Sequence, residues 1–250
     1  MRDAVAALRA RLSDYRKDRF LRRRRRRATA PYPLSIYRDL CRRVAAGRVV
    51  NPPFAIPARP RPRELRVFLR HDVDTALCTT RLRAIADANL ETGTRAGIFF
   101  RVDDEEYRMR DHRALAAELY GEGFEVGLHT ACYVDDDYLG RLRREAEKFA
   151  NEVGFAPSTF TVHGLGLFRW EVRQRFYEEI ADCLAKFGFA FSDCHPSLRA
   201  YDYVIEDCHR DTTTGARFIY EDFERLPLFL RPAHDYLVLT HPCYWSPGLP

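Results

Sequence analysis

The alternation of short apolar runs with longer segments of helical character constrains the fold of this 250-residue chain more than any other feature. Short apolar runs are typical of buried strands, and the segments between them are long enough to be crossover helices. Parallel neighbours need such connections, so the pattern predicts an α/β barrel or an open α/β sheet. The predicted strands are 65–71, 95–100, 124–128, 158–162, 188–192, 202–206 and 236–240, and the predicted helices are 77–91, 111–121, 135–152, 170–187 and 221–230.

The first 63 residues have a different character from the rest of the chain. Residues Arg22–Arg27 are six consecutive arginines, and they account for the formal net charge of +5. Residues 2–27 contain few helix breakers and place apolar side chains at helical spacing, which predicts a basic amphipathic helix. A proline-rich linker follows. We therefore predict a basic helical N-terminal extension with its linker at 1–63 and an α/β barrel domain at 64–250.

The arginine block leaves two interpretations open. A basic amphipathic helix can lie on an anionic membrane surface, so peripheral contact of Arg22–Arg27 with lipid is one prediction. The other is a solvated helix face that has no specific partner. Nucleic acid is not expected as a partner, because no aromatic side chain that would stack on bases lies within the arginine run.

Cysteine usage and hydropathy indicate the compartment. The seven cysteines are scattered, odd in number and without a Cys-x-x-Cys pair, which argues against a disulfide framework and a zinc ribbon. No apolar signal region follows the first residues, and no run is long enough to span a bilayer. We therefore expect reduced thiols and a cytoplasmic protein, with any membrane contact limited to the surface.

Two aspartates end the first apolar run of the predicted α/β domain, in the sequence His71-Asp72-Val73-Asp74. In a strand, residues i and i+2 point to the same face, so Asp72 and Asp74 should project together. Carboxylates this close repel each other, and a metal ion would bind one and leave the other ionised as a base. The alternative is that Asp74 or Thr75 merely caps the following helix.

Histidines follow three other predicted strands, as His129, His163 and His241. Active sites of parallel α/β proteins form where the carboxyl ends of the strands meet, so these side chains should gather beside the aspartates. One Asp with two His is a common ligand set for a divalent metal, and it leaves positions open for water and substrate. Each histidine alone is more often structural, but their shared position favours a site.

The motifs together resemble the polysaccharide deacetylase family, which has a NodB homology domain and is similar to carbohydrate esterase family four. The resemblance covers about residues 64–245 and implies a deformed (β/α) barrel of about seven parallel strands. It implies that Asp72 is the catalytic base and Asp74 a metal ligand. The two aspartates are adjacent in most of the family, whereas His-Asp-Val-Asp versions occur in its intracellular branches.

The remaining family motifs match with one departure. The second motif, His-Ser/Thr-x-x-His, corresponds to the segment from His129 to Tyr133, so tyrosine stands at the second ligand position. We expect His163 to replace the missing ligand. The last motif implies that His241 is the catalytic acid. We expect zinc as the metal, although this ligand set also accepts cobalt, nickel, iron or manganese.

Further residues are predicted to bind substrate. One of them is Tyr133, which stands where the family has its second ligand histidine. The family's pocket tryptophan corresponds to Trp245, and Asp207 would either contact substrate hydroxyls or orient a catalytic histidine. A phosphate of a sugar nucleotide would meet His209 and Arg210. The alternative for the segment from Asp207 to Arg210 is a turn. An arginine, Arg70 or Arg169, would keep the base ionised. The predicted substrate-binding set is Tyr133, Asp207, His209, Arg210 and Trp245.

The expected function is metal-dependent removal of an acetyl or other acyl group from an N-acetylated sugar. A nucleotide-linked or lipid-linked precursor of a surface polysaccharide would suit a cytoplasmic enzyme. One alternative is an Asp-x-Asp glycosyltransferase, which gives the three histidines no role. A haloacid dehalogenase phosphatase would need threonine or valine where Ala76 stands. Another is a catalytically degenerate deacetylase fold acting as a carbohydrate-binding or interaction module, which Tyr133 supports.

Overall fold

The computed structural model describes residues 32–46, 49–53, 64–102, 106–132, 137–163, 179, 184–192, 201–207 and 232–246. Its strands are β1 (Tyr32–Pro33), β2 (Val49–Val50), β3 (Leu65–Val73), β4 (Ala96–Phe100), β5 (Glu125–Thr130), β6 (Thr159–Val162), β7 (Phe191–Ser192), β8 (Tyr203–Glu206), β9 (His234–Thr240) and β10 (Trp245–Ser246). Its α-helices are α2 (Leu34–Ala46), α3 (Ala76–Thr92), α4 (Arg113–Gly121) and α5 (Tyr138–Val153), and 3-10 turns are η1 (Met109–His112), η4 (Ala185–Phe187) and η5 (Pro242–Tyr244).

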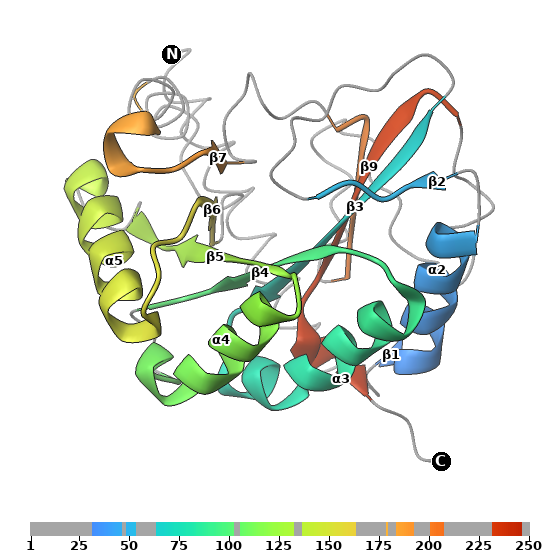
Figure 1. The fold of residues 1–250 in the computed structure, drawn as a ribbon, viewed down its shortest axis with the longest axis horizontal. Coiled ribbons are helices and arrows are strands. Elements are labelled where there is room, and N and C mark those ends of the chain that lie inside the picture. The colour runs from blue at the N-terminus through green and yellow to red at the C-terminus, as the bar shows by residue number, and fades with distance from the viewer. Residues whose placement is uncertain are drawn as a thin grey trace, which may run out of the picture. The chain divides into compact units, whose positions relative to one another are not determined.

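The described residues form a sheet in which seven strands run parallel in the order β7-β6-β5-β4-β3-β9-β8 (Figure 1). Within the described part of the chain, no pairing joins β7 to β8, so the sheet curls without closing. Helices α3, α4 and α5 connect β3 to β4, β4 to β5 and β5 to β6. The α/β class and the deformed (β/α) barrel of about seven parallel strands are thereby confirmed.

Most predicted elements are present, with differences at their ends. The helices predicted at 77–91, 111–121 and 135–152 correspond to α3, α4 and α5. Strand β7 contains only the last two residues of the run predicted at 188–192, because Gly188, with a φ of +77°, belongs to the turn that ends η4 and the Phe189 N–H bonds back to the carbonyl of Leu184. The predicted helix at 221–230 and most of that at 170–187 lie outside the described residues.

Strand β3 occupies the centre of the sheet and delivers its last residues to the site. It pairs with β4 from Leu69 to Val73 on one side and with β9 from Leu65 to His71 on the other. After Leu65, all of its residues are buried. A strand buried on both faces is typical of parallel sheets, and this explains the continuous apolar run in the sequence.

Helix α2 belongs to the same compact unit as the sheet, which begins at Pro33. Its buried side chains recur at helical spacing and pack toward α3; they are Leu34, Tyr37, Leu40, Cys41 and Val44. Strand β2 then pairs with the start of β3, and the Asn51 side chain donates hydrogen bonds to the carbonyls of Val67 and Arg95. The unit therefore includes residues that we predicted to be extension and linker. Residues Arg22–Arg27 lie outside the described part.

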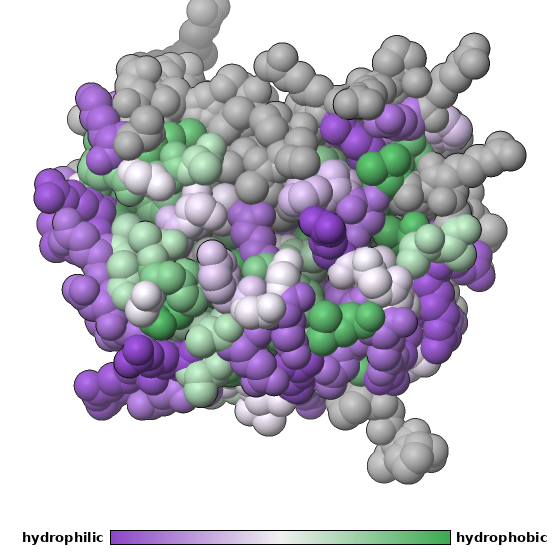
Figure 2. Space-filling model, viewed as in Figure 1, coloured by the Kyte–Doolittle hydropathy of each residue, from purple (hydrophilic) through white to green (hydrophobic). Residues whose placement is uncertain are grey.

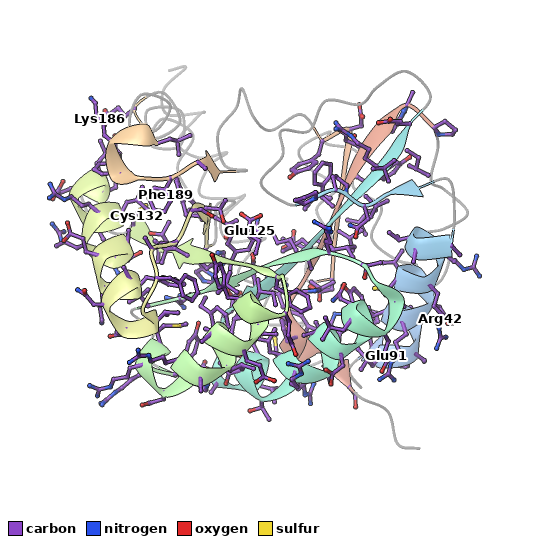
Figure 3. The ribbon with its side chains drawn as sticks, viewed as in Figure 1. Arg42, Glu91, Glu125, Cys132, Lys186 and Phe189 are labelled. Atoms are coloured by element: carbon purple, nitrogen blue, oxygen red, sulfur yellow. The ribbon has the colours of Figure 1, made fainter. Side chains whose placement is uncertain are left out.

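The outer helices are amphipathic. Helix α5 buries Leu142, Phe149 and Val153 along one stripe, and hydrophilic side chains cover much of the face shown in Figure 2. Arg42 on α2 and Glu91 on α3 lie at the outer edge of the molecule (Figure 3). None of the helices in the described segments has the length and apolar character needed to cross a membrane.

Candidate metal centre

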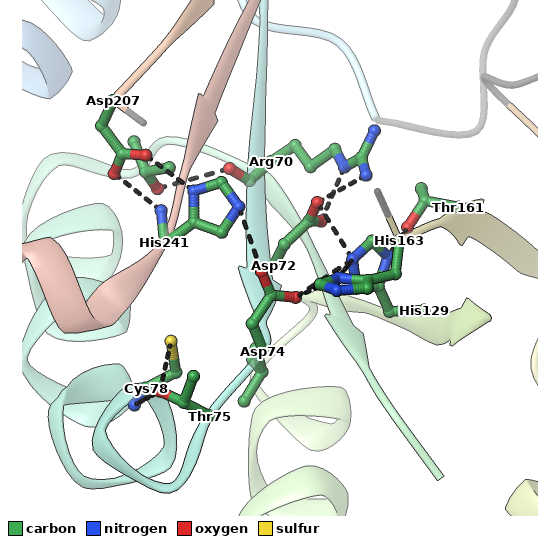
Figure 4. A network of polar contacts seen from close by, with 12 residues as sticks. Arg70, Asp72, Asp74, Thr75, Cys78, His129, Thr161, His163, Asp207 and His241 are labelled. Atoms are coloured by element: carbon green, nitrogen blue, oxygen red, sulfur yellow. Dashed lines mark hydrogen bonds and ion pairs between the residues drawn. The ribbon is translucent and has the colours of Figure 1, made fainter. Parts of the chain in front are cut away.

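Neither aspartate at the end of β3 is needed to cap the next helix, so both side chains are available to the site. Thr75 is the N-cap of α3, and its hydroxyl accepts a hydrogen bond from the backbone N–H of Cys78. A capping threonine satisfies a helical donor that would otherwise lack a partner. Asp72 and Asp74 are therefore not used as caps, and both side chains face His129, which lies on β5 (Figure 4).

Asp74, His129 and His163 bring three ligand atoms together (Figure 4). The Oδ1 atom of Asp74 lies 3.1 Å from His129 Nε2 and 3.1 Å from His163 Nδ1, and the two nitrogens are 3.3 Å apart. Donors about 2.0 Å from a zinc ion at tetrahedral angles lie about 3.3 Å from one another. The three atoms therefore match one face of a tetrahedral site, and the fourth position faces away from them.

Hydrogen bonds behind the triad fix the two imidazoles. The Nδ1 atom of His129 lies 2.7 Å from the hydroxyl of Thr161, so its Nε2 atom turns toward Asp74. The backbone N–H of His163 donates to the carbonyl of Thr130 at 2.8 Å and extends the ladder between β5 and β6. Burial raises the pKa of Asp74, but hydrogen bonds from both histidines outweigh it and hold that pKa well below its usual range.

Asp72 lies beside the triad and is held by an arginine of its own strand. Arg70 donates from Nε to Oδ1 at 2.7 Å and from Nη2 to Oδ2 at 2.5 Å, a bidentate pair. Burial raises the pKa of Asp72, but the charge and hydrogen bonds of Arg70, with His129, lower it below its ordinary value. The carboxylate is ionised at neutral pH, as a general base must be, and Asp72 Oδ2 is 3.5 Å from His129 Nε2.

Packing across three strands supports Arg70. Its guanidinium lies over the ring of Phe99, 5.7 Å from the centroid. Phe99 fits because its neighbour on β5 is glycine: a Cβ on Gly127 would lie 2.6 Å from Phe99 Cε1 and 2.8 Å from the carbonyl oxygen of Thr159. Such contacts are too short to be tolerated without a shift of the ring or the strand. Gly127 therefore positions the arginine that holds the predicted base.

His241 follows β9 and approaches the triad from the other side of β3. Its Nε2 atom lies 3.4 Å from Asp74 Oδ2, while its Nδ1 atom is 2.7 Å from Oδ1 of Asp207. Asp207 also accepts hydrogen bonds from the His241 backbone and from the Trp245 indole, each at 2.7 Å. A buried carboxylate in this position fixes the orientation of the imidazole ring.

Asp207 and Trp245, two residues of the predicted substrate-binding set, are both buried, and their contact with substrate stays a prediction. Asp207 is buried beneath His241, so of its two predicted roles the structure favours orientation of the histidine. Trp245 is 1 % exposed, and its indole packs behind Asp207. Neither side chain lines an open surface. Tyr133, His209, Arg210 and Arg169 lie outside the described residues.

The third polar residue of the β3 motif, His71, points away from the site. It is fully buried, and its ring contacts Thr240, Tyr37 and Asn89. Burial lowers its pKa to about 3, so the imidazole is neutral and serves to join β3, β9, α2 and α3. The supporting role of Thr161 was not predicted from the sequence, although alternation along β6 places Thr161 on the same face as His163.

Comparisons with known proteins give only distant likenesses. No protein-family model and no curated protein matches the chain. Among solved structures, the polysaccharide deacetylase Bc1974 from Bacillus cereus is similar with a TM-score of 0.43 and 14% identity, over 72% of this chain and 80% of that one. BA3943 from Bacillus anthracis, a CE4 family pseudoenzyme, is similar with a TM-score of 0.43 and 17% identity, over 75% of this chain and 59% of that one. A BA3943 mutant with restored enzymatic activity has the same TM-score and identity.

Proposed function

We propose that this protein is a metal-dependent hydrolase that removes an acetyl or other acyl group from an N-acetylated sugar. One observation carries the proposal: Asp74, His129 and His163 bring three ligand atoms together, with the Asp72 carboxylate on one side and the His241 imidazole on the other. Asp72 lies 3.5 Å from the triad atom His129 Nε2, and His241 Nε2 lies 3.4 Å from Asp74. Metal-dependent hydrolysis of an amide uses a Lewis acid, a general base and a general acid around the acyl carbon.

A divalent metal held by Asp74, His129 and His163 would supply Lewis-acid activation of water and of the acyl carbonyl. The residues of the chain supply the proton transfers. Asp72 is ionised by its pair with Arg70 and accepts the proton of the attacking water. His241 directs Nδ1 to Asp207, so its Nε2 atom is the one that donates a proton to the departing amine.

The metal, the substrate and the location are proposed on chemical grounds. Two nitrogens and one carboxylate oxygen suit zinc, and also cobalt, nickel, iron or manganese. An acetamido sugar linked to a nucleotide or lipid, as a precursor of a surface polysaccharide, would suit a cytoplasmic enzyme. Contact of Arg22–Arg27 with an anionic membrane would bring the enzyme to a lipid-linked substrate.

Acetate release tests the proposal. The purified protein, loaded with zinc or cobalt, is incubated with UDP-N-acetylglucosamine and with chitooligosaccharides, and free acetate and free UDP are measured together. We expect acetate from wild type, a loss of about 100-fold or more in Asp72→Asn and His241→Ala, and normal activity in Asp87→Asn, whose carboxylate is an exposed partner of Arg83. Release of UDP without acetate would instead identify a glycosyltransferase.

A further inference from the structure

The two imidazoles of the triad use different ring nitrogens. His129 presents Nε2, because its Nδ1 atom is bonded to Thr161. His163 presents Nδ1, which is 3.1 Å from Asp74 Oδ1 and 3.3 Å from His129 Nε2. The rings stand perpendicular, with an interplanar angle of 89°. The edge of His163 that carries Nε2 is therefore turned out of the triad.

The backbone explains why the nearer nitrogen of His163 is used. His163 follows β6 without an intervening residue, and its N–H donates to the carbonyl of Thr130 on β5. This bond holds the Cα atom at strand spacing from the residue that follows His129. Because the Cα atom is held so close to the triad, the ring nitrogen nearer the backbone, Nδ1, lies beside the other two ligand atoms.

The outer nitrogen of His163 differs in its surroundings from that of His129. Ligand histidines usually bond their second nitrogen to a protein oxygen, as His129 does with Thr161. Among the described residues, no side chain or carbonyl forms a hydrogen bond with Nε2 of His163, and 29% of this side chain is exposed, against 2% for His129. The His163 side chain is thus partly open to solvent at the triad, whereas that of His129 is buried.

We propose that His163 binds the metal through Nδ1 and that its Nε2–H donates a hydrogen bond to an oxygen of the substrate. A neutral imidazole whose Nδ1 lone pair is used for a ligand bond must carry its proton on Nε2. The residue that replaces the family's second motif histidine then becomes both a ligand and a specificity residue. The substrate contact rests on the proposed function, whereas the choice of ligand atom is independent of it.

Paired substitutions test the ligand atom. The amide of asparagine can take the place of Nδ1 and that of glutamine the place of Nε2. We expect His163→Asn to bind Zn²⁺ at least about tenfold more tightly than His163→Gln, in competition with a chromophoric chelator. His129→Asn and His129→Gln form the matched control and should show the opposite order. Tighter zinc binding by His163→Gln would overturn the assignment.

The wild-type protein offers a test that needs no variant. With ¹¹³Cd bound, metal coupling over three bonds reaches only Hε1 from an Nδ1 ligand, but both Hε1 and Hδ2 from an Nε2 ligand. The proposal predicts one histidine of each pattern, with His163 showing Hε1 alone. Coupling of cadmium to Hδ2 of His163 would refute Nδ1 ligation, whatever the activity of the protein.

The substrate contact is tested by kinetics of the zinc-saturated His163→Asn variant, which keeps a ligand atom but has no outer N–H. We expect KM for the acetylated sugar to rise about fivefold, with a smaller change in kcat. An unchanged KM at full metal occupancy would overturn the contact. If wild type shows the predicted cadmium pattern but releases no acetate, the proposed function fails and the ligand assignment stands.

Discussion

Arg70→Met isolates the role of the arginine that holds the predicted base. Methionine keeps an unbranched side chain over Phe99 but removes the bidentate bonds of 2.7 and 2.5 Å to Asp72. Both side chains of this pair are at least nine-tenths buried. Removing one partner of a buried pair leaves the other charge without compensation, at a cost of about 3–5 kcal/mol.

The same strand provides a matched control. Arg66 makes a bidentate pair with Asp235 at 2.7 and 2.6 Å, equally buried, and lies over the ring of Phe68. Arg66→Met should therefore lower the free energy of unfolding by a similar amount, about 3–5 kcal/mol. This pair lies at the opposite end of β3 from the site. The two variants should match in stability and differ in activity.

The pH dependence separates the two variants. Arg70 lowers the pKa of Asp72 against the opposing effect of burial, so in wild type the base stays ionised into the acidic range. In Arg70→Met this pKa rises, and the acid limb of kcat/KM moves to higher pH. The stability that the ionised Asp72 contributes is present above its unfolded pKa and lost as pH falls through its folded pKa, so the deficit of Arg70→Met should shrink in acid.

The assay combines urea unfolding with pH profiles of acetate release. The expected result is an acid limb that moves upward in Arg70→Met and stays in place in Arg66→Met. Arg70→Lys retains the charge and should give an intermediate profile. An identical profile for Arg70→Met and Arg66→Met, or full activity of Arg70→Met in the acidic range, would refute the assignment of Arg70 to the base.

Three further predictions address the supporting structure. Gly127→Ala should lower the free energy of unfolding by about 1–3 kcal/mol, because its Cβ would meet Phe99 and a backbone carbonyl, and an unchanged Tm would contradict this. Trp245→Phe removes one donor to Asp207 and should lower kcat about tenfold at constant metal content, so unaltered kcat would argue against a positioning role. The pKa of His71 is lowered from 6.5 to about 3, so between pH 7.5 and pH 5 this histidine takes up a proton only in the unfolded chain. The free energy of unfolding of wild type should therefore fall by about 2 kcal/mol over this range. Urea titrations at the two pH values should show a smaller fall for His71→Gln.

The parts of the site that follow from strand geometry could be predicted from the sequence. Alternation along β3 placed Asp72 and Asp74 on one face, and the strand-end position of His163 marked it as a ligand candidate. These inferences need only the period of a strand and the rule that parallel strands end together. They do not depend on how side chains pack.

The parts that depend on packing could not be predicted. Burial of Trp245 behind Asp207 depends on contacts between segments far apart in the sequence. The choice of Nδ1 on His163 depends on one backbone hydrogen bond to Thr130. Helix α2 was not predicted from the sequence, and its place beside the sheet depends on the contacts of Tyr37 with His71 and Asn89.

Metal content tests the central claim most directly. Elemental mass spectrometry of the purified protein should find about one equivalent of a transition metal in wild type and in Asp72→Asn, and little in Asp74→Ala or His163→Ala. That result would establish the ligand set and separate it from the base. A wild-type protein that contains no metal, and takes up neither zinc, cobalt nor manganese when these are supplied, would contradict the proposed centre.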